Sequence, residues 1–117
     1  MTQTTEEILQ QRGSRYGEFV QVANLTQALH QTLMQTYYNT HGGAGASPLP
    51  AYIIESWHMI CNKLARAACG DPYYIENFKD ISGYSTLVAT ELGKQDGATD
   101  AIVSLIKRKD GEWVDVP

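Results

Sequence analysis

Apolar residues recur at intervals of three and four along residues 16–38. This spacing places side chains on one face of an α-helix. The resulting stripe consists of Val22, Leu25, Leu29 and Leu33, with Phe19 and Tyr37 on its flank. We therefore expect a long amphipathic helix over these residues, with the stripe facing a core.

A second long helix is expected after a loop. The segment HGGAGASPLP at 41–50 is rich in glycine and proline, which predicts an irregular connection. Pro50 suits the first position of a helix, and Gly70 suits the position after its last residue, Cys69. The expected inner face of this helix consists of Ile53, Trp57, Ile60, Leu64 and Ala67.

Another helix is expected directly after Gly70. Asp71 can cap its N-terminus, Pro72 can open it and Gly93 can end it. Its expected buried face consists of Tyr74, Phe78, Ile81, Ser85, Val88 and Leu92. Because the connection to the preceding helix is short, the two helices are expected to run antiparallel.

The N-terminal segment carries a helix start signal. Thr4 followed by Glu7 is a capping-box pattern, so a short helix is expected from there to about Gly13. The sequence therefore predicts a mainly α protein, in which a small antiparallel bundle of about four helices forms one domain over residues 1–93.

Residues 94–117 are expected to form a C-terminal extension packed on the same domain. Within it, residues 98–116 allow two alternatives. One is a β-hairpin that turns at Asp110 and Gly111, since both flanking segments are rich in β-branched and apolar residues. The other is a short helix capped by Thr99, with basic residues in its last turn.

The composition of the chain argues against several classes of function. The chain has 117 residues, which fits one domain, and its net charge of −4 argues against duplex nucleic acid as a partner. It has no apolar run of the ~20 residues that a membrane span needs, and its start lacks the order of a signal peptide. A cytoplasmic protein with no membrane partner is expected. Cys61 and Cys69 are too far apart on one helix for a disulfide, so free thiols are expected.

One long stretch of the chain carries no charge. From Phe19 through Ile54, 36 consecutive residues include no Asp, Glu, Lys or Arg. The outer face of the first long helix carries Gln21, Asn24, Gln27, His30, Gln31 and Gln35. Uncharged amides can face water, but charge depletion is also typical of the centre of a subunit interface. We therefore expect a homo-oligomer.

Two polar stripes are expected to face each other across the last two helices. Lys63 and Arg66 are three residues apart, and Asn77, Asp80 and Tyr84 form a row on the next helix. These stripes can enclose a cleft with cationic groups for an anion. The alternative is that Lys63 and Asp80 form a structural ion pair.

A second cationic segment precedes the first long helix. RGSRYGEF at 12–19 contains Arg12, Arg15 and Tyr16 between glycines. Glycines let a backbone approach a ligand closely, and arginines match phosphate oxygens in a bidentate way. The segment predicts phosphate binding, with an ordinary Arg-Gly turn as the alternative.

Metal binding has one candidate pair. Glu76 and Asp80 are one helical turn apart and could hold a magnesium ion that bridges to a phosphate. The alternative is that Glu76 is simply exposed. No cofactor is expected unless the protein is a hydrolase, in which case Mg²⁺ is expected.

The same residues carry a family resemblance. RGSRYGEF and MICNKLARAACGDPYYIENFKDISGYSTLV resemble a family of small phage and prophage proteins, over roughly residues 10–92. The shared positions are Arg12, Gly13, Tyr16, Gly17, Phe19, Lys63, Arg66, Gly70, Asp71, Asp80, Gly83 and Tyr84. The resemblance implies a location in the cytoplasm of a host cell.

The helical architecture is also similar to MazG-like nucleotide pyrophosphohydrolases. Those enzymes place paired acidic residues on facing helices to hold magnesium. Here Lys63 and Arg66 stand opposite Asp80. This departure disfavours hydrolysis and leaves binding of a nucleotide or phosphate open.

These observations lead to one expected function and two alternatives. We expect a protein that binds a phosphorylated small molecule, such as a nucleotide or cyclic nucleotide signal, and sequesters it to counter a host defence. The expected ligand-binding residues are Arg12, Arg15, Tyr16, Lys63, Arg66, Asn77, Asp80 and Tyr84. The alternatives are a magnesium-dependent pyrophosphohydrolase that uses Glu76 and Asp80, and an inhibitor that contacts a host enzyme through its uncharged helix.

Overall fold

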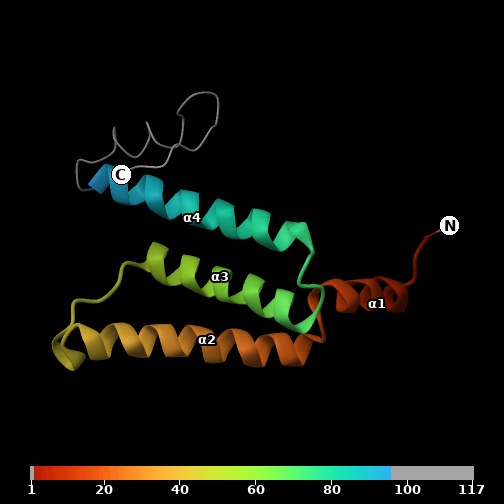
Figure 1. Cartoon of the computed structure of the whole chain (residues 1–117), viewed down its shortest axis with the longest axis horizontal. Coiled ribbons are helices and arrows are strands. Elements are labelled where there is room, and N and C mark those ends of the chain that lie inside the picture. Colours follow the sequence, from red (N-terminus) through yellow and green to blue (C-terminus); the bar gives the residue numbers. More distant parts are fainter. Residues whose placement is uncertain (1, 96–117) are drawn as a thin grey trace.

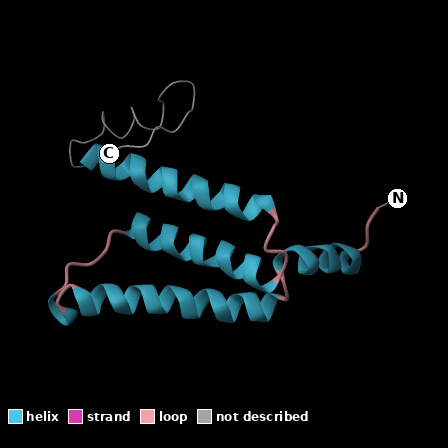
Figure 2. Cartoon of the chain, in the orientation of Figure 1, coloured by secondary structure: helices cyan, strands magenta, loops and turns pink. Residues whose placement is uncertain are grey.

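The structure is a computed structural model that describes residues 2–95. Four α-helices follow one another: α1 (Thr5–Tyr16), α2 (Phe19–Thr40), α3 (Ala51–Cys69) and α4 (Ile75–Gln95), with a 3₁₀ turn, η1 (Gly43–Gly45), after α2 (Figures 1 and 2). The described part is mainly helical and contains no strand, which confirms the expected mainly α class. The hairpin or helix expected over 98–116 lies outside the described residues.

The first two helices begin where side chains satisfy their free backbone N–H groups. At α1, the Thr4 hydroxyl accepts a hydrogen bond from the Glu7 backbone N–H at 3.1 Å, and the Glu7 carboxylate accepts one from the Thr4 N–H at 3.3 Å. At α2, the Glu18 carboxylate accepts from the N–H groups of Val20 and Gln21, each at 3.2 Å. The capping box is as predicted, but α1 continues past Gly13 to Tyr16, so α2 begins three residues later than expected.

Of the last two helices, α4 differs from the prediction at both of its ends. α3 covers Ala51–Cys69 and ends where expected, while Pro50, expected as its first residue, is its N-cap. Asp71 does not open α4 directly, because its carboxylate accepts from the Tyr73 N–H at 2.9 Å and its carbonyl from the Tyr74 N–H at 3.2 Å. These bonds form a turn, and α4 starts only at Ile75. α4 also continues past Gly93, since a glycine inside a helix costs only about 1 kcal/mol relative to alanine.

The three long helices form a single layer. α3 lies between α2 and α4 and runs antiparallel to both, while α2 and α4 make no contact with each other (Figure 1). α1 contacts α2 and α3 at one end of the layer and projects beyond it. The antiparallel order agrees with the prediction, but a closed bundle would bring α2 and α4 together.

An open layer leaves few apolar side chains inside. Within residues 2–95, the buried hydrophobic residues are Val22, Cys61, Ala65 and Ala67, and α1 buries none. Several of the leucines and aromatics expected in the core are exposed instead, with Leu64 at 45% and Phe78 at 49%. The predicted apolar stripes are present on the helices, but this chain alone does not cover them.

The two interhelical connections at one end of the layer cross in direct contact. The Asp71 N–H donates to the Arg15 carbonyl at 2.9 Å. Gly17 has a φ of +86°, and a Cβ at this position would lie 2.5 Å from the Cβ of Cys69. A Cβ on Gly70 would lie 2.5 Å from the Gly17 nitrogen and closer still to the Arg15 carbonyl oxygen. This crossing anchors α1 and fixes where its arginines emerge.

Candidate functional site

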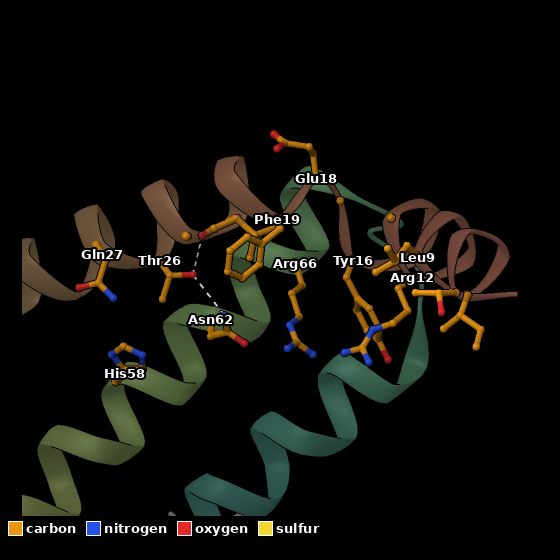
Figure 3. Close-up of a pocket in the computed structure, with 16 residues that line it drawn as sticks. Leu9, Arg12, Tyr16, Glu18, Phe19, Thr26, Gln27, His58, Asn62 and Arg66 are labelled. Carbon is orange, nitrogen blue, oxygen red and sulfur yellow. Dashed lines mark hydrogen bonds between the residues drawn. The ribbon is translucent and has the colours of Figure 1, made fainter.

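A cavity of about 940 Å³ lies where α1 meets the N-terminal part of α2 and the C-terminal part of α3. Its apolar wall includes Ile8, Leu9, Phe19 and Val22. Its polar wall includes Arg12, Tyr16, Thr26, Gln27, His58, Asn62 and Arg66 (Figure 3). We call this cavity the α1 pocket. Side chains from three helices that are separate in the sequence therefore converge here.

Two arginines share one tyrosine in the α1 pocket. The guanidinium carbon of Arg66 lies 4.6 Å from the ring centroid of Tyr16, and that of Arg12 lies 5.8 Å from it. Figure 3 shows both guanidinium groups beside this ring. Guanidinium groups are attracted to the negative face of an aromatic ring, so the ring holds two like charges near each other.

Neither of these arginines forms an ion pair with a carboxylate of residues 2–95. Glu18 also lines the pocket, but its carboxylate caps α2 and points away from the arginines (Figure 3). Each guanidinium group has five N–H donors and no acceptors. The pocket therefore presents a pair of cations whose donors are available to an anion.

The second arginine of the RGSRYGEF segment lies elsewhere. Arg15 does not line the α1 pocket, and its guanidinium carbon lies 5.4 Å from the ring centroid of Tyr74. Tyr74 in turn contacts the edge of Tyr16 at 5.6 Å between centroids. Arg15 thus stabilises the crossing of the two connections, through this ring and through its carbonyl.

Where the sequence predicts a cleft between α3 and α4, two of the expected ligand residues form an ion pair with each other. Lys63 is buried and its Nζ lies 3.0 Å from an oxygen of Asp80. Asn77 is buried in the same region, Tyr84 is half-buried, and none of the four lines the α1 pocket. Arg66 faces the pocket although Lys63 does not, because a step of three residues turns the direction by about 60° around a helix.

The magnesium site suggested by the sequence does not fit the side chains present. Glu76 pairs with Lys79 at 3.5 Å, and Asp80 pairs with Lys63. Each carboxylate therefore already has an ammonium partner. No cluster of three or more His, Cys, Asp or Glu side chains suited to a metal occurs within residues 2–95.

Several polar residues of the pocket, among them Thr26, Gln27, His58 and Asn62, were not predicted. Asn62 stands one turn before Arg66 on α3 and His58 two turns before it, so the spacing of four was a visible signal. The Asn62 amide donates to the Thr26 hydroxyl of α2 at 3.4 Å, and Thr26 donates to the Val22 carbonyl. Gln27 belongs to the face of α2 that carries uncharged amides such as Gln21 and Asn24. The sequence alone did not show that this face meets α3.

His30 of α2 contacts the polar wall of the α1 pocket through His58. Its ring contacts the edge of His58 at 5.2 Å between centroids, and its Nε2 is buried without a hydrogen-bond partner within the described chain. This contact helps to fix the ring of His58 at the pocket.

Both cysteines are free thiols, as expected. Cys61 is only 3% exposed, and burial raises the pKa of its thiol. A thiol with a raised pKa holds little thiolate at neutral pH, so Cys61 is a packing residue and no nucleophile.

No helix of the described segment has both the length and the apolar character needed to cross a membrane. Of the eight residues predicted to bind a ligand, the structure brings Arg12, Tyr16 and Arg66 together in the α1 pocket and places the other five outside it. Comparisons with protein-family models, with curated proteins and with solved structures found no match to this chain.

Proposed function

We propose that the protein binds a phosphorylated small molecule, a nucleotide or a cyclic nucleotide, in the α1 pocket. The observation that carries this proposal is the pair of guanidinium groups, Arg12 and Arg66, beside Tyr16 and without carboxylate partners in residues 2–95. Guanidinium forks match phosphate oxygens, and two forks from different helices can hold one phosphate from two directions.

The charge of the whole chain strengthens this argument. The net charge is −4, so the protein has more carboxylates than basic groups to pair them. Two arginines that remain unpaired with carboxylates of the described chain are therefore unusual. A nearby anionic ligand would offset the repulsion between them, because like charges at close range destabilise each other.

The remaining walls suit the other parts of a nucleotide. Phe19 is 82% exposed at the cavity edge, and a free aromatic ring is a platform on which a base can stack. The amides of Gln27 and Asn62 offer donors and acceptors to a base edge or a ribose. The volume of about 940 Å³ lies within the range of small-molecule sites.

In this proposal the protein binds its ligand and breaks no bond. The resemblance to phage and prophage proteins supports a role in sequestering a nucleotide signal of host defence, in the host cytoplasm. The pairing of Glu76 and Asp80 with lysines gives no support to magnesium-dependent hydrolysis.

The test is a binding titration with matched arginine variants. A panel of mono-, di- and cyclic nucleotides is titrated calorimetrically into the wild type, Arg66→Gln and Arg15→Gln. Both substitutions remove an arginine that lies against a tyrosine, but only Arg66 lines the pocket. We expect Arg66→Gln to weaken binding about 10-fold or more and Arg15→Gln to change it less than about 2-fold.

Two results would overturn the proposal. One is that no phosphorylated compound binds the wild type. The other is that Arg15→Gln and Arg66→Gln weaken binding equally, since this would place the anion outside the α1 pocket. Release of pyrophosphate during the titration would show instead that the protein hydrolyses its ligand.

A further inference from the structure

The side-chain amide of Asn62, on the wall of the α1 pocket, is held in one orientation by its neighbour on α2. The Thr26 hydroxyl has a single proton, which it donates to the Val22 carbonyl at 2.7 Å. The same hydroxyl can therefore only accept from Asn62, whose amide nitrogen lies 3.4 Å from it. Turning the amide over would place two acceptors against each other, so the nitrogen faces Thr26 and the oxygen does not.

The amide oxygen of Asn62 is an acceptor without a donor in the described chain. Within residues 2–95 it receives no hydrogen bond, and Figure 3 shows it on the side of the amide that is turned toward Arg66. Thr26 is only 2% exposed, so the group that orients the amide is shielded from water. The pocket wall thus carries a positioned acceptor, which favours a ligand group that donates a hydrogen bond.

The place of this acceptor on α3 relates it to the arginine pair. Asn62 precedes Arg66 by one turn, or about 6 Å along the helix axis, and lies on the same side of the helix. In a nucleoside 5′-monophosphate the hydroxyl groups of the sugar are the donors nearest to the phosphate, and the donors of the base lie farther away. A phosphate held by Arg12 and Arg66 therefore brings the sugar, rather than the edge of the base, to Asn62.

The next turn of α3 suits the base. His58 precedes Asn62 by one further turn, and Gln27 of α2 lies at the same end of the pocket (Figure 3). A neutral imidazole and an amide each combine donors with an acceptor, as the edges of bases do, whereas guanidinium groups offer donors alone. Complements to a phosphate, a sugar and a base thus follow one another along the pocket in that order.

We propose, as an extension that rests on the proposed function, that the α1 pocket selects ribonucleoside 5′-monophosphates. The Asn62 amide oxygen accepts a hydrogen bond from a hydroxyl group of the ribose, and Thr26 is the residue that positions this amide. A 3′,5′-cyclic nucleotide suits the site less. Its phosphodiester consumes one sugar hydroxyl and leaves fewer free phosphate oxygens for the two guanidinium groups.

The experiment measures how much the sugar hydroxyls contribute to binding. AMP, GMP, CMP and UMP, each with its 2′-deoxy and 3′-deoxy form, are titrated calorimetrically into the full-length wild type. We expect at least one deoxy form to bind about 5-fold more weakly than its ribonucleotide, because it lacks the donor that Asn62 needs. We call this ratio of affinities the ribose preference. Its measurement in the wild type does not depend on any variant folding.

Matched variants separate a sugar contact from a general loss of affinity. Asn62→Leu removes the acceptor, so the ribose preference should disappear. Thr26→Val removes only the group that orients the amide and should reduce the preference to less than about 2-fold, whereas Thr26→Ser keeps the hydroxyl and should retain it. Arg66→Gln should weaken ribo and deoxy forms together and leave their ratio unchanged. Circular dichroism compares the helix content of all variants.

The outcomes distinguish a wrong sugar contact from a wrong ligand class. If no nucleotide binds the wild type, the proposed function and the sugar contact are both wrong. If ribo and deoxy forms bind the wild type equally while Arg66→Gln still weakens binding, the nucleotide site stands and the role of Asn62 is wrong. That role is also wrong if only cyclic nucleotides bind, or if Asn62→Leu keeps the ribose preference.

Discussion

A methyl group on Gly70 would lie 2.5 Å from the backbone nitrogen of Gly17. The connection between α1 and α2 therefore touches the connection between α3 and α4 with no room for a side chain at either residue. Gly17 of RGSRYG and Gly70 of CGDP are explained by this contact between two backbones. Close approach was the right property to infer from them, but the approaching group is the chain itself and no ligand is needed.

Alanine substitutions at these glycines are expected to destabilise the fold. Gly70→Ala forces two backbones apart, and Gly17→Ala adds the strain of a positive φ. We expect each to lower the free energy of unfolding by about 2–4 kcal/mol, measured by chemical denaturation. Gly13→Ala is the control, because a Cβ there meets nothing within 4 Å and lies inside α1. It should be neutral or stabilise by up to ~1 kcal/mol. Equal losses at Gly13 and Gly70 would contradict this account.

Tyr16 is expected to position the two pocket arginines through its ring. Tyr16→Phe keeps the ring and should retain nucleotide affinity within about 2-fold, since the cation contact uses the π face. Tyr16→Leu removes that face and should weaken binding about 10-fold, measured by the same calorimetric titration. A large loss in Tyr16→Phe would instead assign the role to the phenolic hydroxyl.

The Lys63–Asp80 pair should respond unequally to removal of its two members. Asp80→Asn leaves a buried ammonium group without its carboxylate, so we expect a loss of about 1–3 kcal/mol in the free energy of unfolding. Lys63→Met leaves only a half-exposed carboxylate and should cost less. Glu76→Gln, in an exposed pair, should change stability by less than about 0.5 kcal/mol. None of the three substitutions should alter nucleotide affinity. A loss of affinity in Lys63→Met would show that Lys63 contacts the ligand.

Cys61 should make the fold less stable at high pH. Burial raises the pKa of its thiol in the folded state, so the unfolded chain releases this proton first as the pH rises. Its contribution to stability is complete below the unfolded pKa, which is ~8.5, and is lost as the pH rises from there through the folded pKa. We therefore expect the stability advantage of the wild type over Cys61→Ala to shrink between about pH 8 and pH 10. An advantage that is constant over this interval would contradict the prediction.

Thiol labelling provides a second check on Cys61. Cys69 is half-buried and should react with an aromatic disulfide reagent well before Cys61 at neutral pH. Equal rates in the folded protein would show that Cys61 is accessible.

The helices could be predicted from the spacing of apolar residues. Where a predicted helix end was wrong, the cause is a local hydrogen bond or turn. Asp71 and Pro72 carry the signals of a helix start, yet the Asp71 carboxylate binds the Tyr73 N–H and closes a turn first. Spacing also identifies which side of each helix is apolar, but it does not show what covers that side. For this reason Leu64 and Phe78 were predicted as buried and are exposed in the single chain.

The candidate site could be predicted only in part. Arg12 and Tyr16 were identified because arginines between glycines suit a phosphate, and Arg66 was identified as one of two cations on the same helix. Lys63 was grouped with Arg66 because both are basic and three residues apart. On a central helix with neighbours on two sides, a turn of about 60° is enough to direct one side chain to α4 and the other to the pocket. Such a division depends on helix order in space, which the sequence pattern does not contain.

The central position of α3 has a consequence for how the chain reaches its native state. The long helices contact only their immediate neighbours along the chain, so no distant segment must arrive before the α2–α3 hairpin can close. Local connectivity of this kind is associated with rapid folding. A ribosome would release each hairpin in order, and the α2–α3 pair can form before α4 has been synthesised.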